Sequence, residues 1–275
     1  MHDGDERGIL TLVAEVVQLV ERRLPKPKVA GSSPVFRSSI SSAEASYFLF
    51  LVGRRGHSRV IDALVKYSRR MITDNLAFGT TGNLSVREQN LLWITPSGVP
   101  FDDVTLDNVV GVDIDSGKIV HSLARPSSEL PLHLALYRNR SDIIAVVHTH
   151  SEYATVFATL GESIVPVHYQ MALSAYEVKC APYATYGTDK LAHNALQTLG
   201  TTDRAVLLEN HGLVAVGSDL ATAYQSALDV EWMARLLYRA RCVGKPRVLT
   251  PQEHLEIREQ FRHYGQHPSE MNSKT

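Results

Sequence analysis

Two histidines separated by one residue end an apolar stretch of the sequence, in the segment AVVHTHS. Successive side chains of a β-strand point to opposite faces, so His148 and His150 should share a face, with their backbones roughly 7 Å apart. Two imidazoles on one face can reach a single metal ion. The spacing therefore indicates a metal site at a strand end. The alternative is that both are hydrogen-bonded polar side chains where the core meets solvent.

A third imidazole occurs in the segment ENHGLVAVG. His211 also stands at a predicted strand end, in a sharp turn where Gly212 is expected to let the backbone bend. Three histidines and one open position are the usual arrangement of a catalytic zinc site. From the residues alone, a zinc site and ordinary strand-end histidines both stay open. Three isolated histidines are assigned structural or solvent-exposed positions: His133, His168 and His193.

Three short stretches combine small hydroxyl or amide side chains with glycine or proline. They are GTTGN at 79–83, TPSG at 95–98 and PSSE at 126–129. Glycine permits close backbone approach, and Ser, Thr and Asn donate hydrogen bonds. The third stretch opens a predicted helix, whose free N–H groups and dipole favour an anion. Together the stretches could bind a phosphate without lysine, although each could also be an ordinary turn or helix cap.

Glu129 lies in the first turn of that predicted helix. One role for a carboxylate at this position is helix capping or compensation of the helix dipole. The other is general acid/base chemistry beside a metal ion, which requires a carboxyl group whose pKa is set by burial and by the ion. The sequence permits both roles.

Periodicity predicts the elements that carry these residues. Helices are predicted over 59–78, 127–140, 151–161 and 219–244. Strands are predicted within 82–88, 91–98, 109–115, 118–121, 141–150 and 204–217, the last as two strands that meet at His211. The pair Ser116-Gly117 indicates a hairpin. Because strands and helices mix without a regular βαβ repeat, the expected fold class is α/β, a single domain with a mostly antiparallel sheet covered by helices on both faces.

Composition limits the class of protein. The chain has 275 residues, 44% hydrophobic and 21% charged, with a formal net charge of -1. These values are ordinary for a globular protein and predict no nucleic-acid or acidic-membrane partner. No run reaches the roughly 18–20 apolar residues of a membrane span. Two cysteines are too few for a disulfide scaffold and favour a reducing cytoplasm.

The first 55 residues read differently from the rest. Residues 22–46 are rich in Pro, Ser, Lys and Arg and show no helix or strand period. We expect 1–55 to be a disordered extension or a misplaced translation start. The alternative is a short amphipathic helix that docks on the domain or on a partner.

The ordered series of motifs resembles the class II aldolase/adducin family across about residues 57–266. These motifs are GTTGNLSVR, ITPSG, PSSELPLH, AVVHTHS, VHYQMA, CAPYATYGT, ENHGLVAVG and FRHYG. The resemblance implies a three-layer α/β/α domain over 56–268, a tail at 269–275, and a homotetramer with sites between subunits. It implies one Zn²⁺ per subunit, held by His148, His150 and His211, with Glu129 as a further ligand when substrate is absent.

The same resemblance implies an activity. This is reversible cleavage of a ketose 1-phosphate such as L-fuculose 1-phosphate to dihydroxyacetone phosphate and L-lactaldehyde. Glu129 would move the proton on the donor carbon, Tyr169 from a neighbouring subunit would protonate the aldehyde oxygen, and Tyr264 on the tail would help to close the site. The implied phosphate-binding residues are Thr80, Gly82, Asn83, Ser97, Gly98, Ser127 and Ser128.

Three departures from the family pattern limit this transfer. The turn reads ENHG where the family's fuculose enzymes have a histidine before the ligand, MALSAYEV lacks their glycines, and the first 55 residues have no counterpart. Alternatives are 4-epimerisation, decarboxylation and a non-catalytic adducin-like scaffold. The epimerases carry Asp in place of Glu129, and retention of this residue and all three histidines favours the aldolase.

Overall fold

A computed structural model describes residues 54–121 and 124–262 of the chain. Tyr264, the segment 269–275 and residues 1–53 of the predicted 1–55 extension lie outside this range, so the expectations about them stay predictions; residues 54 and 55 begin the first described helix. Within the described range no helix is long and apolar enough to cross a membrane.

Four helices form where the sequence predicts them. They are α3 (Arg54–Thr73), which begins before the predicted residue 59, α4 (Leu130–Asn139), α5 (Glu152–Leu160) and α7 (Leu220–Val243). Two further helices, α6 (Asp189–Leu199) and α8 (Pro251–Arg262), were not predicted. Short 3₁₀ turns occupy η1 (Phe101–Asp103) and η2 (Tyr169–Leu173).

Eight strands form one sheet in the order β4-β3-β2-β1-β5-β8-β7-β6. Their bounds are β1 (Asn83–Glu88), β2 (Leu91–Ile94), β3 (Val110–Asp113), β4 (Ile119–His121), β5 (Ala145–Thr149), β6 (Cys180–Ala181), β7 (Ala205–Leu208) and β8 (Gly212–Gly217). Every neighbouring pair is antiparallel except β6 and β7. The predicted α/β class with a mostly antiparallel sheet is therefore confirmed. The predicted hairpin also forms, with Gly117 at φ +70° between β3 and β4.

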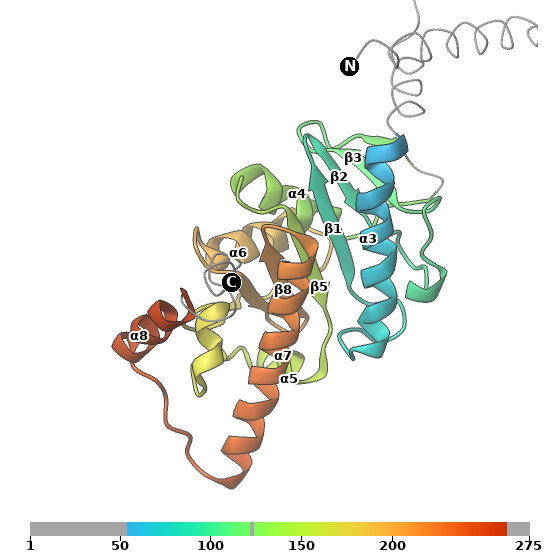
Figure 1. The fold of residues 1–275 in the computed structure, drawn as a ribbon. Coiled ribbons are helices and arrows are strands. Elements are labelled where there is room, and N and C mark those ends of the chain that lie inside the picture. Colours follow the sequence, from blue (N-terminus) through green and yellow to red (C-terminus); the bar gives the residue numbers. More distant parts are fainter. Residues whose placement is uncertain (1–53, 122–123, 263–275) are drawn as a thin grey trace, which may run out of the picture. The chain divides into compact units, whose positions relative to one another are not determined.

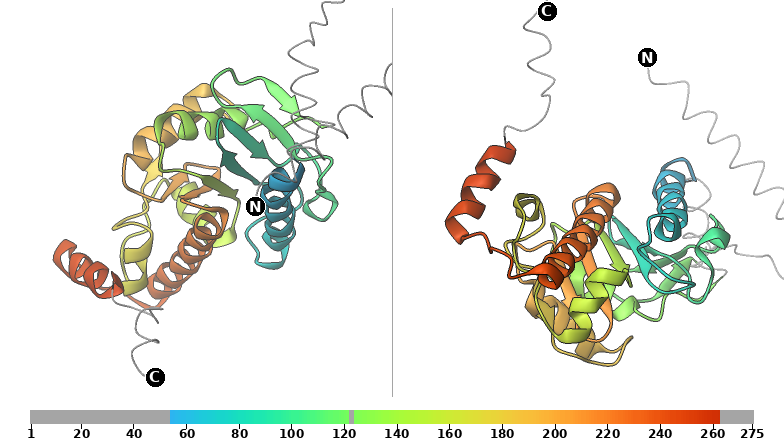
Figure 2. Two further views of the ribbon diagram at one scale, coloured as in Figure 1. Left: turned by 45° about the horizontal axis from the view of Figure 1, so that its top comes forward. Right: turned by 90° about the horizontal axis from the view of Figure 1, so that it is seen from below.

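Helices cover both faces of this sheet, as predicted. Helices α3, α5 and α7 pack on one face, and α4 and α6 lie behind the other (Figures 1 and 2). Successive side chains of β5 point to opposite faces of the sheet. Val147 therefore packs in the core beneath α3, α5 and α7, and Val146 packs in the core beneath α4 and α6. Each is fully buried, which contributes about 1.5–3 kcal/mol per side chain to folding.

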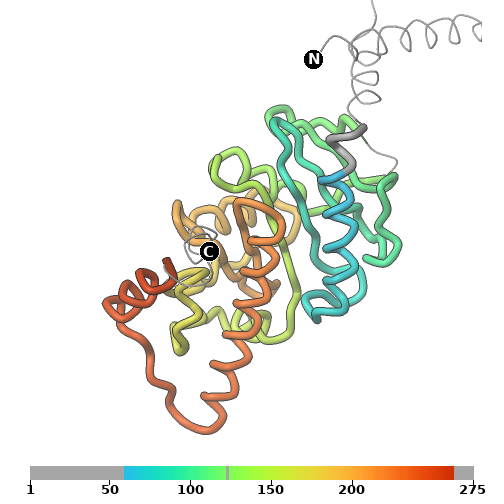
Figure 3. The backbone as a smooth tube through the Cα atoms, in the orientation of Figure 1, coloured from blue at the N-terminus to red at the C-terminus, as the bar shows by residue number. Residues whose placement is uncertain are grey.

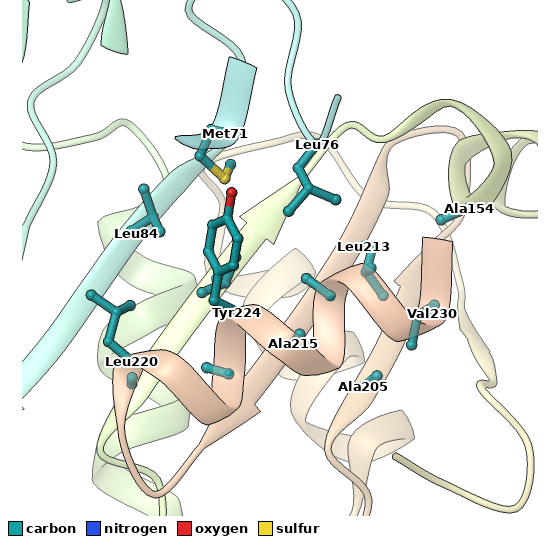
Figure 4. Packing of buried hydrophobic residues seen from close by; sticks show 14 of the residues in the cluster. Met71, Leu76, Leu84, Ala154, Ala205, Leu213, Ala215, Leu220, Tyr224 and Val230 are labelled. Atoms are coloured by element: carbon teal, nitrogen blue, oxygen red, sulfur yellow. The ribbon is translucent and has the colours of Figure 1, made fainter. Parts of the chain in front are cut away.

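The core under α3 and α7 holds in place the C-terminal end of β5, which carries His148 and leads to His150. Figure 4 shows Tyr224 of α7 directed toward Met71 of α3, with Leu76 and Leu84 nearby. The Tyr224 hydroxyl donates to Asp74 at 3.0 Å. The backbone N–H of His150 donates to the carbonyl of Leu76 at 3.1 Å. The loop after α3 is thereby tied to the strand end that carries the paired histidines.

Strands far apart in the sequence meet at this point. The central strand β5 lies between β1 and β8, as the chain trace in Figure 3 shows. His148 pairs with Asn83 of β1 on one side and with Val214 of β8 on the other. Register alone therefore places an amide side chain beside the first histidine.

Candidate active site

The two histidines at the end of β5 do share a face. Their Nε2 atoms lie 3.0 Å apart. His148 is fully buried, and its Nδ1–H donates to the carbonyl of Leu213 at 2.9 Å. This bond fixes the tautomer, so the lone pair of Nε2 faces the cluster.

His211 completes a triangle of imidazoles. Its ring centroid lies 4.8 Å from that of His148 and 4.9 Å from that of His150. The turn that carries it bends at Asn210, which has φ +55°, and not at Gly212 as expected. The glycine serves a different purpose, because a Cβ there would lie 2.3 Å from the carbonyl oxygen of Thr149. Close approach of β8 to β5 requires it.

Glu129 faces the three histidines from the start of α4. It occupies the N-cap position rather than the predicted first turn, and its side chain makes no cap hydrogen bond. One carboxylate oxygen, Oε2, lies 2.9 Å from His148 Nε2, and Oε1 lies 3.3 Å from His211 Nε2. Oε1 is buried without a hydrogen-bond partner. The capping role is therefore wrong, and the carboxylate belongs to the cluster.

The donor set fits a metal ion. Ligand atoms of Glu129, His148, His150 and His211 all lie within 4.8 Å of one another. A buried carboxylate oxygen without a hydrogen-bond partner is energetically unfavourable. A cation bound between this oxygen and the three imidazoles would stabilise it. Three nitrogens and one oxygen suit Zn²⁺ and related divalent ions.

The four members of the cluster shift one another's pKa values in different directions. Burial would raise the pKa of Glu129, but His148 and His211 lower it well below its usual range. Burial would lower the pKa of His148, but Glu129 and the hydrogen bond to the Leu213 carbonyl together raise it. Burial lowers the pKa of His150 to about 3 and that of His211 to about 4. These two rings are neutral near pH 7 and can offer lone pairs to a cation.

The three loops predicted to bind phosphate meet around one cavity of about 340 Å³ beside the cluster. A bridge between Pro96 and Pro126 joins the second and third loops, and the N–H of Ser127 donates to the carbonyl of Thr95 at 3.2 Å. Every predicted phosphate position lines the cavity, together with Glu129, His150 and His211: Thr80, Gly82, Asn83, Ser97, Gly98, Ser127 and Ser128. No lysine or arginine is among its described lining residues.

Tyr169 lies elsewhere. It is 53% exposed on η2, and its ring stacks on Phe261 of α8 at 5.9 Å. It does not line the described cavity. Within one chain the structure therefore does not bring Tyr169 to the cluster, and Tyr264 lies outside the described residues.

Other lining residues were not predicted. Thr81, Pro96, Tyr183, Ala184, Tyr186 and Asn210 also line the cavity. The loop that carries Tyr183 is tied to the His211 turn, because its N–H donates to Glu209 at 2.8 Å. The motif CAPYATYGT marked this loop, but nothing in the sequence indicated that it reaches the cavity.

His133 was assigned a structural or exposed position, and it is fully buried. Its Nε2 lies 2.5 Å from Asn83 Oδ1, and its Nδ1 lies 2.6 Å from Ser85 Oγ. Burial lowers its pKa to about 3. The sequence did hold a signal for this burial. Asn83 and Ser85 alternate on one face of β1, and this face lies under α4, which carries His133.

Comparison with known proteins agrees with this geometry. Residues 62–238 match the family described as Class II Aldolase and Adducin N-terminal domain. The chain is 40% identical over 208 residues to a 5-deoxy-D-ribulose 1-phosphate aldolase of Bacillus thuringiensis serovar kurstaki, covering 74% of this chain and 96% of that protein. It is 36% identical over 210 residues to the L-fuculose phosphate aldolase of Escherichia coli K12, covering 75% and 94%.

A solved structure of an L-fuculose 1-phosphate aldolase superposes with a TM-score of 0.72 at 40% identity, over 74% of this chain and 97% of that one. The relatives named here are aldolases, so the expected enzyme class, aldehyde-lyase, is confirmed. The motifs, the sheet order and these matches together place the chain in the class II aldolase and adducin family.

Proposed function

We propose that the chain is a zinc-dependent aldolase that reversibly cleaves a ketose 1-phosphate to dihydroxyacetone phosphate and a short aldehyde. The observation that carries the proposal is the convergence of two kinds of group on one cavity. Three histidines and Glu129 form one wall, and three loops rich in hydroxyl groups and glycine form the others. A phosphate in the loops would place the nearby C2 carbonyl group of the sugar, and C3 beside it, close to the cluster.

The loops suit a phosphate through neutral donors. Thr80, Ser97 and Ser128 are exposed at the cavity, and Ser127 and Ser128 stand just before the N-terminus of α4. Hydroxyl groups and the N-terminal end of a helix both favour an anion. Gly82, at φ +84°, lies so close to the carbonyl oxygen of His148 that a Cβ would be 2.7 Å away. This packing holds the first loop against the histidine strand.

In the proposed reaction the C3–C4 bond of the ketose breaks. The C4 hydroxyl loses its proton and becomes the aldehyde carbonyl, and the bond electrons move into the C2 carbonyl system of the three-carbon fragment. Zinc, when bound by His148, His150 and His211, would act there as a Lewis acid. Glu129 then delivers a proton to C3, which gives dihydroxyacetone phosphate, and removes it in the reverse direction.

Glu129 is suited to this role by its surroundings. The residue is 5% exposed, and its carboxylate receives a hydrogen bond from Asn83 Nδ2 at 2.9 Å. Burial excludes water that would compete for the proton, and the amide holds one oxygen in place. Its other oxygen is left facing the cluster and the cavity.

We place Tyr169 in the site of a neighbouring subunit, where it would accept the proton of the C4 hydroxyl during cleavage and protonate the aldehyde oxygen in the reverse direction. Its exposure supports this assignment, as does its support from behind by His168 and Phe261 at centroid distances of 4.5 and 5.9 Å. The assembly proposed with it is a homotetramer with sites between subunits, and Tyr264 is proposed to close the same site. Both cysteines, Cys180 and Cys242, are free, which suits a reducing cytoplasm.

Two substrates are proposed. L-fuculose 1-phosphate would give L-lactaldehyde, and 5-deoxy-D-ribulose 1-phosphate would give acetaldehyde. The second is favoured by the relative of that name, which is 40% identical over 96% of its length. Both sugars end in a methyl group, which suits the wall formed by Tyr183, Ala184 and Tyr186.

The test is release of dihydroxyacetone phosphate from a panel of ketose 1-phosphates with and without a terminal methyl group. The proposal expects cleavage, with kcat/KM highest for a methyl-ended sugar. Carbon dioxide release or epimer formation without cleavage would replace the aldolase by another reaction of the family. A protein without stoichiometric metal and without any reaction would be a scaffold.

A further inference from the structure

A line of buried hydrogen bonds runs from Glu129 through the interior of the domain. Asn83 Nδ2 donates to Glu129 Oε2 at 2.9 Å, and Asn83 Oδ1 lies 2.5 Å from His133 Nε2. The other ring nitrogen of His133 lies 2.6 Å from Ser85 Oγ, which lies 2.8 Å from the hydroxyl of Tyr137. At most 5% of any of these residues is exposed. The line joins β1 to α4 beneath the candidate site.

The chemistry of the groups fixes the direction of the bonds nearest the site. An ionised carboxylate can only accept, so Asn83 must present its NH₂ group to Glu129. Its carbonyl oxygen then faces the other way and needs a donor. The only donor that faces it in the described part of the chain is His133 Nε2. This nitrogen must therefore carry a hydrogen, whether the ring is neutral or charged.

The rest of the line holds the ring in that orientation. Ser85 and Tyr137 occupy the Nδ1 side of His133, and the guanidinium of Arg87 covers the Tyr137 ring at 4.9 Å. A flipped ring would present a carbon to Asn83 and leave its buried carbonyl oxygen unpaired. Such an unpaired group is costly, so one orientation is strongly preferred.

We propose that His133 is a positioning residue for Glu129, acting by fixing the side-chain amide of Asn83 so that its NH₂ group holds one oxygen of the carboxylate. The proposal deepens the proposed function and rests on it for its effect on turnover. A purely structural role for His133 would stabilise the domain without affecting proton transfer by Glu129. The two roles therefore differ in what a variant changes.

The first test measures the protonation of the His133 ring directly and does not depend on enzymatic activity. Long-range ¹H–¹⁵N spectra of histidine-labelled protein, with and without zinc, report which nitrogen of His133 is protonated, and the His133→Phe variant assigns the signal. We expect a hydrogen on Nε2 in both spectra. A ring with hydrogen only on Nδ1 would overturn the proposal, because it could not hold the Asn83 carbonyl.

The second test is a double-mutant cycle on turnover. His133→Phe keeps a ring and removes the donor, and we expect kcat to fall roughly 10- to 100-fold with zinc content retained. In a Glu129→Gln background the same change should lower kcat less than roughly twofold, because the group on which His133 acts is already gone. Equal losses in the two backgrounds, or a rise in KM alone, would show that His133 acts elsewhere.

Two further variants guard against misfolding of His133→Phe. His133→Gln retains a donor near the position of Nε2 and should recover most of the lost kcat. Ser85→Ala should lower kcat severalfold, whereas Ser68→Ala, which removes another fully buried hydroxyl bonded only within its own helix, should not. Equal effects of the two serine variants would contradict the proposal. If the wild type cleaves no ketose 1-phosphate, the proposed function fails, and the ring spectra still decide whether His133 holds Asn83.

Discussion

At the scale of single residues, the cluster is ordered by contacts that lie behind it. His148 is held by the carbonyl of Leu213, and Glu129 is held by Asn83. These partners leave His148 Nε2 and Glu129 Oε1 directed toward the same small volume. Side chains held from behind lose little freedom when a cation or a substrate arrives, which is the requirement for precise proton transfer.

Replacement of Glu129 by glutamine tests the acid/base role. The change keeps the shape of the side chain and removes its ability to exchange a proton. Turnover should fall roughly 10²-fold or more while zinc content and fold are retained. The measurement is kcat beside metal content. Asp229→Asn, which removes a buried carboxylate bonded to Gln225 on α7, is the matched control and should keep activity. Full activity of Glu129→Gln would remove the assigned role.

The depressed pKa of His133 predicts a pH dependence of stability. Burial lowers the pKa from 6.5 to about 3, so between these values the unfolded chain binds a proton that the folded chain does not. This contribution to stability is full above about pH 6.5 and is lost as the pH falls, by up to about 1.4 kcal/mol per pH unit. Urea unfolding of metal-free protein at fixed concentration should show a smaller decline for His133→Phe. Parallel declines would contradict the assignment.

At the scale of elements, the close contact of β5 with β8 sets the positions of His148, His150 and His211 relative to one another. Gly212 opens β8, and a Cβ on it would meet both the Thr149 carbonyl and, at 3.2 Å, the ring of His150. Gly212→Ala should therefore push the two strands apart, lower the melting temperature and weaken zinc binding together. Gly244→Ala is the control, because its Cβ meets nothing within 4 Å. Normal zinc content in Gly212→Ala would show that the contact does not set the site.

The sequence predicted the features of these elements that depend on local period. Alternation alone placed His148 and His150 on one face, and the same alternation predicted a sheet with two covered faces. The unpredicted α6 also had a local signal, since Thr188 caps it by accepting from the N–H of Leu191. Its apolar residues recur at helical spacing, so the periodicity used for the other helices could have predicted α6 as well.

Contacts between distant segments could not be predicted in this way. The loops at 95–98 and 126–129 meet through the bridge between Pro96 and Pro126, which no local pattern encodes. The purpose of Gly212 was mistaken because the clash that excludes a side chain there involves another strand. His133 was undervalued because its burial and its partners come from β1. Only the resemblance to a family indicated, before the structure did, that these loops share one site with the histidines.

At the scale of the whole molecule, the proposed site is shared. Glu129 lies in the cavity of one chain, and Tyr169 stands exposed away from it. If a neighbouring subunit supplies the tyrosine, Glu129→Gln and Tyr169→Phe should each be nearly inactive alone. Subunits dissociated and reassembled as an equal mixture should recover about a quarter of wild-type turnover, because about a quarter of the shared sites are intact. No recovery in verified mixed assemblies would place both residues in one chain's site.

The central claim is that a metal ion held by the three histidines is required for carbon–carbon cleavage. The most direct measurement is release of dihydroxyacetone phosphate from the preferred ketose 1-phosphate before chelation, after chelation and after zinc is restored, with wild type and His150→Ala in parallel. The account predicts that wild-type release stops and returns with the metal, and that His150→Ala lacks both zinc and activity. Release that persists in the metal-free protein, or a zinc-replete and active His150→Ala, would contradict it.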